Sequence, residues 1–272
     1  MKEKMKELYT PLKAKVVENK PLSPDTNTIG FELLEEGFNL DFTPGQFIQL
    51  SLLGYGEIPV GLASPPGQEK VQVVVRQVGN VTNATKRLQE GDVIGVRGPF
   101  GNGFEKELIH DKSLLIIGGG CGLPPLRSLG LYATQNPDKF KNVDFLYGAR
   151  TKKYLLFRDE YPKWAKEINV HLTVDTDEED WEQRVSLDCN VGVVTHLLTN
   201  EVIHEDTVAC LCGPPIMYRF VVKKLRELGV AEKNILLSLE RRMKCGVGKC
   251  QHCNAGGRSE EHTSELQSLL II

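Results

Sequence analysis

Short apolar runs alternate with polar turn signals over the first hundred residues. The turns are marked by Asp25-Thr26-Asn27, Pro44-Gly45 and Pro65-Pro66-Gly67, combinations that favour chain reversal. The segment Val71–Val78 alternates well enough to give a strand one buried face. Many short strands with one short helix, at Asn83–Gln89, predict a small antiparallel barrel. The strands are expected at Lys13–Glu18, Thr28–Leu34, Phe47–Leu53, Val71–Val78 and Val93–Arg97.

The apolar pattern changes after about residue 110. Leu114–Ile117 is a continuous apolar run, which is typical of a strand covered on both faces. A glycine turn follows, and a helix is expected to begin at Pro124. Strands and helices then alternate, which predicts a parallel doubly wound sheet. Further strands are expected at Val143–Tyr147, Asn169–Val174, Val208–Cys212 and Ile235–Leu239, and further helices near Arg158–Lys166 and at Met217–Leu228.

Together the two patterns predict an N-terminal antiparallel β-barrel followed by a C-terminal α/β doubly wound parallel sheet, with a short C-terminal loop. The chain has 272 residues, enough for two modest domains. We expect the first domain at residues 1–107, the second at 108–240 and the loop at 241–257.

Composition and charge exclude several classes of function. Charged residues make up 25% and hydrophobic residues 40% of the chain, as in ordinary globular proteins. A formal net charge of -3 gives no electrostatic argument for binding nucleic acid or an anionic membrane. The N-terminus lacks the apolar core of a signal peptide, and no apolar run approaches the roughly 20 residues of a membrane span. We therefore expect a cytoplasmic protein with no membrane span.

Glycines cluster where the first parallel strand is expected to turn into a helix. The stretch LLIIGGGCGLPPL, Leu114–Leu126, carries Gly118, Gly119, Gly120 and Gly122. Glycine at such a turn lets backbone amides approach a phosphate. The pattern falls short of the full G-x-G-x-x-G, because leucine occupies the third glycine position, so a simple tight turn is the alternative. The stretch CGPPIM, from residue 212, repeats this arrangement at a later strand end, the edge where ligands bind in such folds.

Three of the seven cysteines lie close together near the end of the chain. Cys245, Cys250 and Cys253 follow the spacing C-x4-C-x2-C, which is the plant-type spacing for three of the four thiolates of a 2Fe–2S cluster. A structural zinc with His252 as fourth ligand is the alternative. It is less favourable because His252 directly adjoins Cys253, which would strain a shared tetrahedron.

The last residues differ from the rest of the chain. Residues 258–268 read RSEEHTSELQS, which is identical to the in-frame translation of a common short-read sequencing adaptor. We therefore expect residues 258–272 to be a non-native tail. Gly257 would be the last native residue, and the fourth cluster ligand would lie in a native C-terminus that this sequence does not contain.

Several motifs occur in an order that resembles the ferredoxin-NADP reductase superfamily. They are PGQF from Pro44, GDVIGVRGPFGNGF from Gly91, GGGCGLPPL from Gly118, YGART from Tyr147 and CGPPIM from Cys212. With ERRMKCGVGKCQHC near the end, the chain resembles the branch that includes the gamma subunit of hydrogenase/sulfur reductase and one of the subunits of anaerobic sulfite reductase. The electron-transfer subunit of dihydroorotate dehydrogenase is a more distant relative. The resemblance implies a flavin-binding barrel, an NAD(P)-binding domain and a 2Fe–2S cluster loop.

The resemblance also implies binding residues. The superfamily's flavin motif Arg-x-Tyr-Ser is replaced here by Ile58-Pro59-Val60-Gly61, while Gly79 and Thr82 remain for the flavin phosphates. The flavin would contact Pro59, Val60, Gly61, Leu62, Val75, Arg76, Gly79, Val81 and Thr82. The dinucleotide would contact Gly118, Gly119, Gly120, Gly122, Leu123, Gly148, Arg150, Cys212, Gly213, Pro214 and Met217. The cluster ligands would be Cys245, Cys250 and Cys253.

These features lead to one main hypothesis and two alternatives. The main hypothesis is an NAD(P)H-dependent flavin oxidoreductase subunit that uses FAD, NAD(P)H and a 2Fe–2S cluster, and no side chain is required as a catalytic acid or base. Its partner would be a catalytic subunit of a hydrogenase, a sulfur or sulfite reductase, or a related complex. The alternatives are an electron-transfer subunit of dihydroorotate dehydrogenase and a non-catalytic zinc or assembly module.

Overall fold

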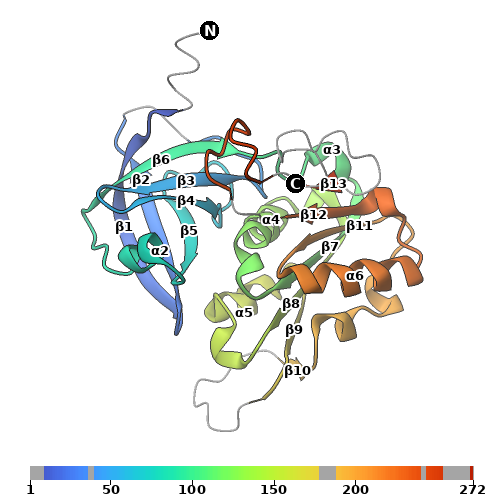
Figure 1. The fold of residues 1–272 in the computed structure, drawn as a ribbon. Coiled ribbons are helices and arrows are strands. Elements are labelled where there is room, and N and C mark those ends of the chain that lie inside the picture. Colours follow the sequence, from blue (N-terminus) through green and yellow to red (C-terminus); the bar gives the residue numbers. More distant parts are fainter. Residues whose placement is uncertain (1–8, 36–39, 178–187, 240–242, 254–269, 272) are drawn as a thin grey trace.

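A closed antiparallel barrel forms the N-terminal half of the protein (Figure 1). The computed structural model describes residues 9–35, 40–177, 188–239, 243–253 and 270–271. The strand order in the barrel is β4-β3-β6-β1-β2-β5, with every neighbouring pair antiparallel. The strands are β1 (Leu12–Ser23), β2 (Thr26–Leu33), β3 (Phe47–Leu52), β4 (Gly56–Gly61), β5 (Val71–Arg76) and β6 (Val93–Phe100), and the short helix is α2 (Asn80–Thr85).

Contacts just beyond β4 close the barrel against β5. Leu62 pairs with Val73 in an antiparallel bridge, and the Ala63 amide donates a hydrogen bond of 2.8 Å to the Gln72 carbonyl. Inside, Ile48 and Leu50 of β3 are fully buried, because alternate residues of a strand point to the same face. The structure thus confirms the antiparallel barrel.

The C-terminal half is built on a parallel sheet with the strand order β10-β9-β8-β7-β11-β12-β13. The chain moves outward from β7 in one direction and then returns to add β11 on the other side. The β7–β11 boundary is therefore a topological switch point, where ligands of such folds bind. The strands are β7 (Lys112–Gly119), β8 (Phe140–Ala149), β9 (Asn169–Val174), β10 (Cys189–Val191), β11 (Thr207–Cys212), β12 (Ile235–Ser238) and β13 (Leu270–Ile271).

Helices cover both faces of this sheet, as predicted (Figure 1). Leu114 and Ile116 of β7 pack into one apolar cluster, with α4 and α5, while Leu115 and Ile117 pack into another, with α6. The helical segments are α3 (Lys106–Ile109), η1 (Gly120–Gly122), α4 (Leu123–Gln135), η2 (Pro137–Lys139), η3 (Lys152–Tyr154), η4 (Arg158–Glu160), α5 (Tyr161–Trp164), η5 (Val194–Leu197), η6 (Asn200–Val202), α6 (Pro215–Glu227) and η7 (Glu232–Asn234).

The barrel packs against the face of the sheet that carries α4. Ala63, Val74 and Phe104 are buried members of the same apolar cluster as the α4 side chains. The two halves therefore share a continuous apolar contact, which places the end of β4 next to the start of α4.

Two predicted helices differ from the structure. The helix expected at Asn83–Gln89 is α2, three residues earlier, and it ends where the Asn19 side chain donates hydrogen bonds to the carbonyls of Thr85 and Leu88, at 3.1 and 2.8 Å. The helix expected near Arg158–Lys166 is split into η4 and the four-residue α5.

The strand β4 was not predicted, because its sequence GEIPVG begins and ends with glycine and contains proline.

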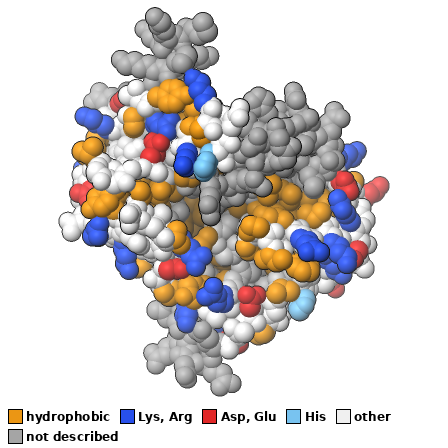
Figure 2. All heavy atoms as spheres, in the orientation of Figure 1, with side chains coloured by type: hydrophobic (Ala, Val, Ile, Leu, Met, Phe, Trp, Pro, Cys, Tyr) orange, Lys and Arg blue, Asp and Glu red, His pale blue; other side chains and the backbone are white. Residues whose placement is uncertain are grey.

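Helix α6 buries one apolar face but also leaves apolar side chains exposed. Met217, Val221 and Leu225 are buried, but Phe220 is 54% and Ile216 60% exposed. Figure 2 shows hydrophobic side chains next to lysine and arginine on this face of the molecule.

The predicted tail lies mostly outside the described residues, although Leu270 and Ile271 pair with Leu236 and Leu237 of β12. No helix of the described residues is long and apolar enough to cross a membrane.

Candidate functional site

The glycine loop, residues 118–122, lies at the switch point of the parallel sheet. Gly118 at the end of β7 is in register with Cys212 at the end of β11, so both glycine-rich stretches meet there. Gly120 has φ +52°, and a Cβ built on it would meet no described atom within 4 Å. The loop is thus open to solvent at Gly120, where a ligand can approach the backbone.

Gly122 is required for the close approach of two backbones. A Cβ on Gly122 would lie 2.5 Å from the Gly213 nitrogen and nearer still to the carbonyl group of Cys212. Real side chains essentially never come under 3.0 Å, so any larger residue would push the two strand ends apart. This glycine holds the loop against β11.

Met217 fills the space beside the loop. A Cβ on Gly119 would lie 2.6 Å from the Met217 sulfur and 3.1 Å from Pro214 Cδ, and one on Gly213 would lie 2.5 Å from Met217 Cε. The thioether, 8% exposed, therefore packs on both glycine backbones. Leu123 and Cys212 belong instead to the buried cluster beneath α4.

Tyr147 supports the loop from below, and the sequence did not single it out as a site residue. Its hydroxyl donates a 3.0 Å hydrogen bond to the Gly120 carbonyl. Complete burial raises the pKa of Tyr147 far above its usual value, so the hydroxyl remains a neutral donor. A tyrosine at the end of a buried strand, directly before Gly148, is the signal that could have identified it.

The remaining dinucleotide candidates lie on β8 and just after it. Gly148 is in register with Gly119, and a Cβ on it would lie 3.2 Å from Val194 and 3.3 Å from Thr173. Arg150 follows the strand, with its guanidinium carbon 5.7 Å from the centre of the Tyr154 ring. Both residues thus lie near the carboxyl edge of the sheet, one packed and one exposed.

The flavin candidates on β4 lie where the barrel meets α4. A Cβ on Gly61 would lie 3.2 Å from Pro125 Cδ, so the end of β4 faces the first turn of α4. Val60 and Leu62 are buried within the barrel core, whereas Pro59 is half-buried. Of this segment, Pro59 and Gly61 have surface available for a ligand.

The other flavin candidates surround the start of α2. Val75 is buried, Val81 packs partly on the barrel core, and the Thr82 hydroxyl accepts hydrogen bonds from the amides of Val78 and Gly79, at 2.9 and 2.8 Å. The first-turn amides of a helix have no intrahelical partner. The amides of residues 80–82 are therefore the donors that α2 can offer to an anionic group.

Arg76 connects the barrel candidates with the glycine loop. Its Nε donates a 2.8 Å hydrogen bond to Asp25. That hydrogen bond, together with the nearby Cys121 and Tyr154, raises the pKa of Arg76. Because Cys121 belongs to the glycine loop, the two predicted binding regions face each other across the junction of barrel and sheet.

The cysteine loop, described over residues 243–253, packs on the outside of the barrel at β3 and β6. Arg97 donates a 3.3 Å hydrogen bond to the Cys245 carbonyl, and Gln49 a longer one of 3.5 Å to the Lys244 carbonyl. Gly246 has φ +74°, and a Cβ on it would lie 2.9 Å from the Phe100 ring. Glycine at 246 therefore allows both the turn and the close contact with β6.

The thiols of this loop are only partly brought together. Burial raises the pKa of Cys245, but hydrogen bonds from the backbones of Cys250, Val247 and Lys249 and from the Cys250 thiol together lower it to about 7. Cys250 is exposed, whereas Cys253 is buried. Within the part of the chain that the structure describes, no three Cys, His, Asp or Glu side chains converge as metal ligands.

Comparisons with known proteins agree with this two-part site. Residues 13–104 match the family described as oxidoreductase FAD-binding domain, and residues 116–223 match the oxidoreductase NAD-binding domain. Together they define the class: an oxidoreductase that combines an FAD-binding barrel with an NAD-binding sheet, as in ferredoxin-NADP reductases. This class favours the enzymatic hypothesis over a non-catalytic assembly module.

The relatives narrow this class. Sulfhydrogenase 2 subunit gamma of Pyrococcus furiosus is 36% identical, over 91% of this chain and 90% of its own. A probable dihydroorotate dehydrogenase B (NAD(+)) electron transfer subunit of the same organism is 35% identical, over 85% and 80%. The chain therefore belongs to the family of flavin- and NAD-dependent oxidoreductase subunits that includes the sulfhydrogenase gamma subunits and these electron transfer subunits.

Solved structures support the same fold. An NADH-dependent reduced ferredoxin-NADP oxidoreductase aligns with a TM-score of 0.71 and 27% identity, over 90% of this chain and 83% of its own. The FAD/NAD-binding domain of nitric oxide dioxygenase from Vibrio cholerae aligns with a TM-score of 0.70 and 20% identity, over 83% and 97%. The second likeness concerns the fold alone.

Proposed function

We propose that this protein is the electron-transfer subunit of an oxidoreductase complex of the sulfhydrogenase type. In this proposal it takes a hydride from NAD(P)H onto FAD and passes electrons through a 2Fe–2S cluster to a catalytic partner subunit. The observation that carries the proposal is the junction at which Gly61 of the barrel faces Pro125, directly after the glycine loop. A flavin on the barrel and a nicotinamide on the loop would meet there.

The dinucleotide part of the proposal is supported by the backbone of the loop. Gly118, Gly119, Gly120 and Gly122 would contact the pyrophosphate, since the loop is open at Gly120. The donors would come from the loop itself, because Pro124 and Pro125 in the first turn of α4 have no amide hydrogen. Gly213, Pro214 and Met217 would form the opposite wall, with Cys212 buried behind them. Leu123, Gly148 and Arg150 complete the proposed set.

The flavin part rests on the barrel surface. Pro59 and Gly61 would lie against the ring system, and Gly79, Val81 and Thr82 would place the first-turn amides of α2 near its phosphates. Arg76 would supply a positive charge between the two regions, with Val60, Leu62 and Val75 as the buried support. FAD bound there would supply the conversion between two-electron hydride transfer and one-electron transfer.

The cluster is the least supported part of the proposal. In its favour, Cys245, Cys250 and Cys253 have the plant-type spacing, and amides directed at Cys245 stabilise its thiolate, the form that binds metal. The described residues do not assemble a complete ligand set. We therefore propose these three thiolates as ligands, and the fourth ligand would come from outside the described residues.

The proposed division of the chain follows these roles. Residues 1–107 form the flavin-binding domain, residues 108–240 the NAD(P)-binding domain and residues 241–257 the cluster loop. Residues 258–272 are proposed as the non-native tail. The cytoplasmic location expected from the sequence stays a prediction.

A dihydroorotate dehydrogenase-type complex is the second candidate, because a relative with that name is 35% identical over 85% of the chain. The genes adjacent to this one discriminate between the two. A gene for a hydrogenase or sulfur reductase catalytic subunit supports the first candidate, and one for a dihydroorotate dehydrogenase catalytic subunit supports the second.

The proposed electron path is tested by separating its two halves. The chain, with residues 258–272 replaced by a short tail that carries one cysteine as the fourth ligand, is reconstituted anaerobically with FAD, iron and sulfide. Reduction of its bound flavin by NADH or NADPH is then compared with reduction of ferredoxin as a one-electron acceptor. We expect Cys250→Ser to lower iron content and ferredoxin reduction by at least about tenfold, with flavin reduction unchanged.

The matched control is Cys189→Ser, which removes a half-buried thiol outside the loop and should change neither reaction. Ferredoxin reduction that is equal in this tail-restored parent and in its Cys250→Ser variant, or a tail-restored parent that retains no iron, would contradict the cluster assignment while leaving the flavin assignment intact.

A further inference from the structure

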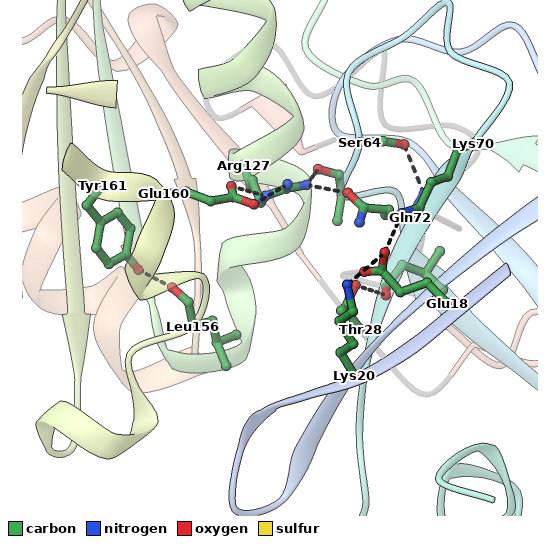
Figure 3. Close-up of polar contacts among 12 residues, drawn as sticks. Glu18, Lys20, Thr28, Ser64, Lys70, Gln72, Arg127, Leu156, Glu160 and Tyr161 are labelled. Atoms are coloured by element: carbon green, nitrogen blue, oxygen red, sulfur yellow. Dashed lines mark hydrogen bonds and ion pairs between the residues drawn. The ribbon is translucent and has the colours of Figure 1, made fainter. Parts of the chain in front are cut away.

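Arg127 of α4 is a buried cation at the junction of barrel and sheet (Figure 3). It is 5% exposed. Within the sheet half, the Arg127 Nε and Nη2 donate hydrogen bonds to the two carboxylate oxygens of Glu160, at 2.8 and 2.7 Å. Its guanidinium carbon also lies 4.0 Å from the centre of the Phe157 ring. This paired, stacked geometry fixes the orientation of the guanidinium plane.

The same guanidinium reaches across to the barrel. Its Nη1 donates a 2.6 Å hydrogen bond to the Ala63 carbonyl and a 3.2 Å hydrogen bond to the Gln72 side-chain oxygen. Figure 3 shows Arg127 between Glu160 and Gln72, with Ser64 beside Gln72. Gln72 is held in turn, since its backbone N–H donates a 3.0 Å hydrogen bond to the Ser64 hydroxyl. Two of the four hydrogen bonds of this side chain therefore cross to the barrel, and the other two hold it to Glu160 in the sheet half.

The position of this link in the chain gives it a role in the reaction. Ala63 lies two residues after Gly61, and Arg127 lies two residues after Pro125, which Gly61 faces. Arg127 is also one helical turn, about 6 Å, from Leu123, where the glycine loop ends. The link thus joins the end of the flavin-facing strand to the start of the dinucleotide-binding helix.

We infer that Arg127 is a positioning residue that sets the separation between the nicotinamide and the flavin ring. Hydride transfer needs reacting atoms about 3–3.5 Å apart, and a displacement of 1 Å can lower the rate about 100-fold. The inference rests on the proposed meeting of NAD(P)H and FAD at this junction. Arg127 touches neither reacting group in this account and acts through the backbones of Ala63 and α4.

The test is single-turnover reduction of the FAD-loaded full chain by NADH and by NADPH. Arg127→Lys keeps the positive charge but loses the planar guanidinium that bonds Glu160 and Ala63 at the same time. Arg127→Met loses both the charge and these hydrogen bonds. We expect the rate constant for flavin reduction at saturating nucleotide to fall by about tenfold in Arg127→Lys and further in Arg127→Met. The nucleotide dissociation constant and FAD content should change by less than about twofold.

A spectroscopic readout separates positioning from simple stability. Stacking of the nicotinamide on the flavin gives a long-wavelength charge-transfer band, and its intensity depends on their separation. We expect this band to weaken in step with the rate constant across the two variants. The matched control, Lys141→Met, removes an ion pair with Asp206 that lies within the sheet half, and should leave both band and rate unchanged.

A second variant covers the case in which Arg127 substitutions prevent folding. Gln72→Met removes only the barrel acceptor, keeps the side-chain volume and leaves the Arg127–Glu160 pair in place. It should lower the rate constant about threefold and weaken the band. An unchanged rate and band in Arg127→Lys, or in Gln72→Met where Arg127→Lys does not fold, overturns the inference even if thermal stability falls. Wild-type protein that binds no FAD would instead contradict the proposed function.

Discussion

The glycine loop and the cysteine loop are both rich in glycine, but the protein holds them in different ways. In the glycine loop, Gly119 and Gly122 are confined by Met217 and by the backbone of Cys212, and Tyr147 supports the loop from beneath. The cysteine loop rests on the barrel through hydrogen bonds to Cys245 and Lys244 and one close contact at Gly246.

This difference shows what a buried scaffold contributes to a binding site. The glycine loop leads from the central strand β7 into α4 and packs against the end of β11, so its conformation is determined by core packing that exists without any ligand. The thiols of the cysteine loop do not converge through protein contacts alone within the described residues. Substitutions that remove packing should therefore affect the first loop far more than the second.

The largest expected effect is that of Gly122→Ala. The new methyl group would lie 2.5 Å from the Gly213 nitrogen, and backbone at this position cannot move without separating β7 from β11. We expect a loss of at least about 3 kcal/mol in the free energy of unfolding and at least about a 100-fold loss in flavin reduction by NAD(P)H. Urea unfolding and stopped-flow absorbance measure the two effects.

Gly130→Ala, in the helix α4 that follows Gly122, is the control for Gly122→Ala. Its methyl group would meet the Phe145 ring at 3.1 Å, a side chain that can shift slightly. Flavin reduction should stay unchanged in this variant. Equal activity in Gly122→Ala and Gly130→Ala would contradict the view that core packing fixes the loop.

The next largest effect is expected for Gly120→Val, which places a side chain in the open part of the loop. The backbone at φ +52° is strained for valine, at a cost of about 1–2 kcal/mol, and the side chain would block the pyrophosphate. We expect the fold to survive and the dissociation constant for NAD(P)H to rise at least about tenfold. Gly67→Val has the same strain at φ +79° with open space around it. If both variants bind NAD(P)H equally well, the dinucleotide assignment of the loop is wrong.

A smaller and more local effect is expected for Gly246→Ala in the cysteine loop. The methyl group would lie 2.9 Å from the Phe100 ring, so the loop should lift from β6 and hold iron less firmly after anaerobic reconstitution. Flavin reduction by NAD(P)H should remain within about twofold of the wild type. Gly54→Ala, also at a positive φ but with open space around it, controls for backbone strain. A loss of flavin reduction in Gly246→Ala alone would show that the two loops are not independent.

The smallest effect is expected for deletion of residues 258–272. Within the described residues, this tail contributes the pairing of β13 with β12, worth about 1–2 kcal/mol. FAD content and NAD(P)H-dependent flavin reduction should not change, because the switch point lies at β7 and β11. Loss of flavin reduction on deletion would show that the tail is part of the functional protein.

Much of the fold could be predicted because it depends on local pattern. The apolar run at Leu114–Ile117 and the glycines after it specify a buried strand and a turn by themselves. The strand β4 was missed because Gly56, Pro59 and Gly61 are poor strand formers, and only its pairing with β3 and the closure of the barrel keep it extended. The apolar pattern of α6 also does not reveal that Phe220 is exposed.

The candidate site also contains residues that could be predicted from the sequence and one that could not. The glycines at the switch point were predictable because the turn itself requires them. Arg127 was not, because its acceptors Ala63 and Gln72 lie 64 and 55 residues away along the chain. One signal was present: an arginine between Leu126 and Leu129, on a helix whose other buried positions, apart from Ser128, are apolar. Such a cation needs partners from elsewhere in the fold.

The most direct test of the account is anaerobic titration of the purified, FAD-reconstituted full chain with NADH and with NADPH. The account predicts that the protein retains about one FAD per chain and that at least one of the two nucleotides bleaches its absorbance near 450 nm within a single turnover. A chain that retains no FAD, or whose bound FAD is reduced by neither nucleotide, would contradict the claim that the barrel and the glycine loop form one hydride-transfer site.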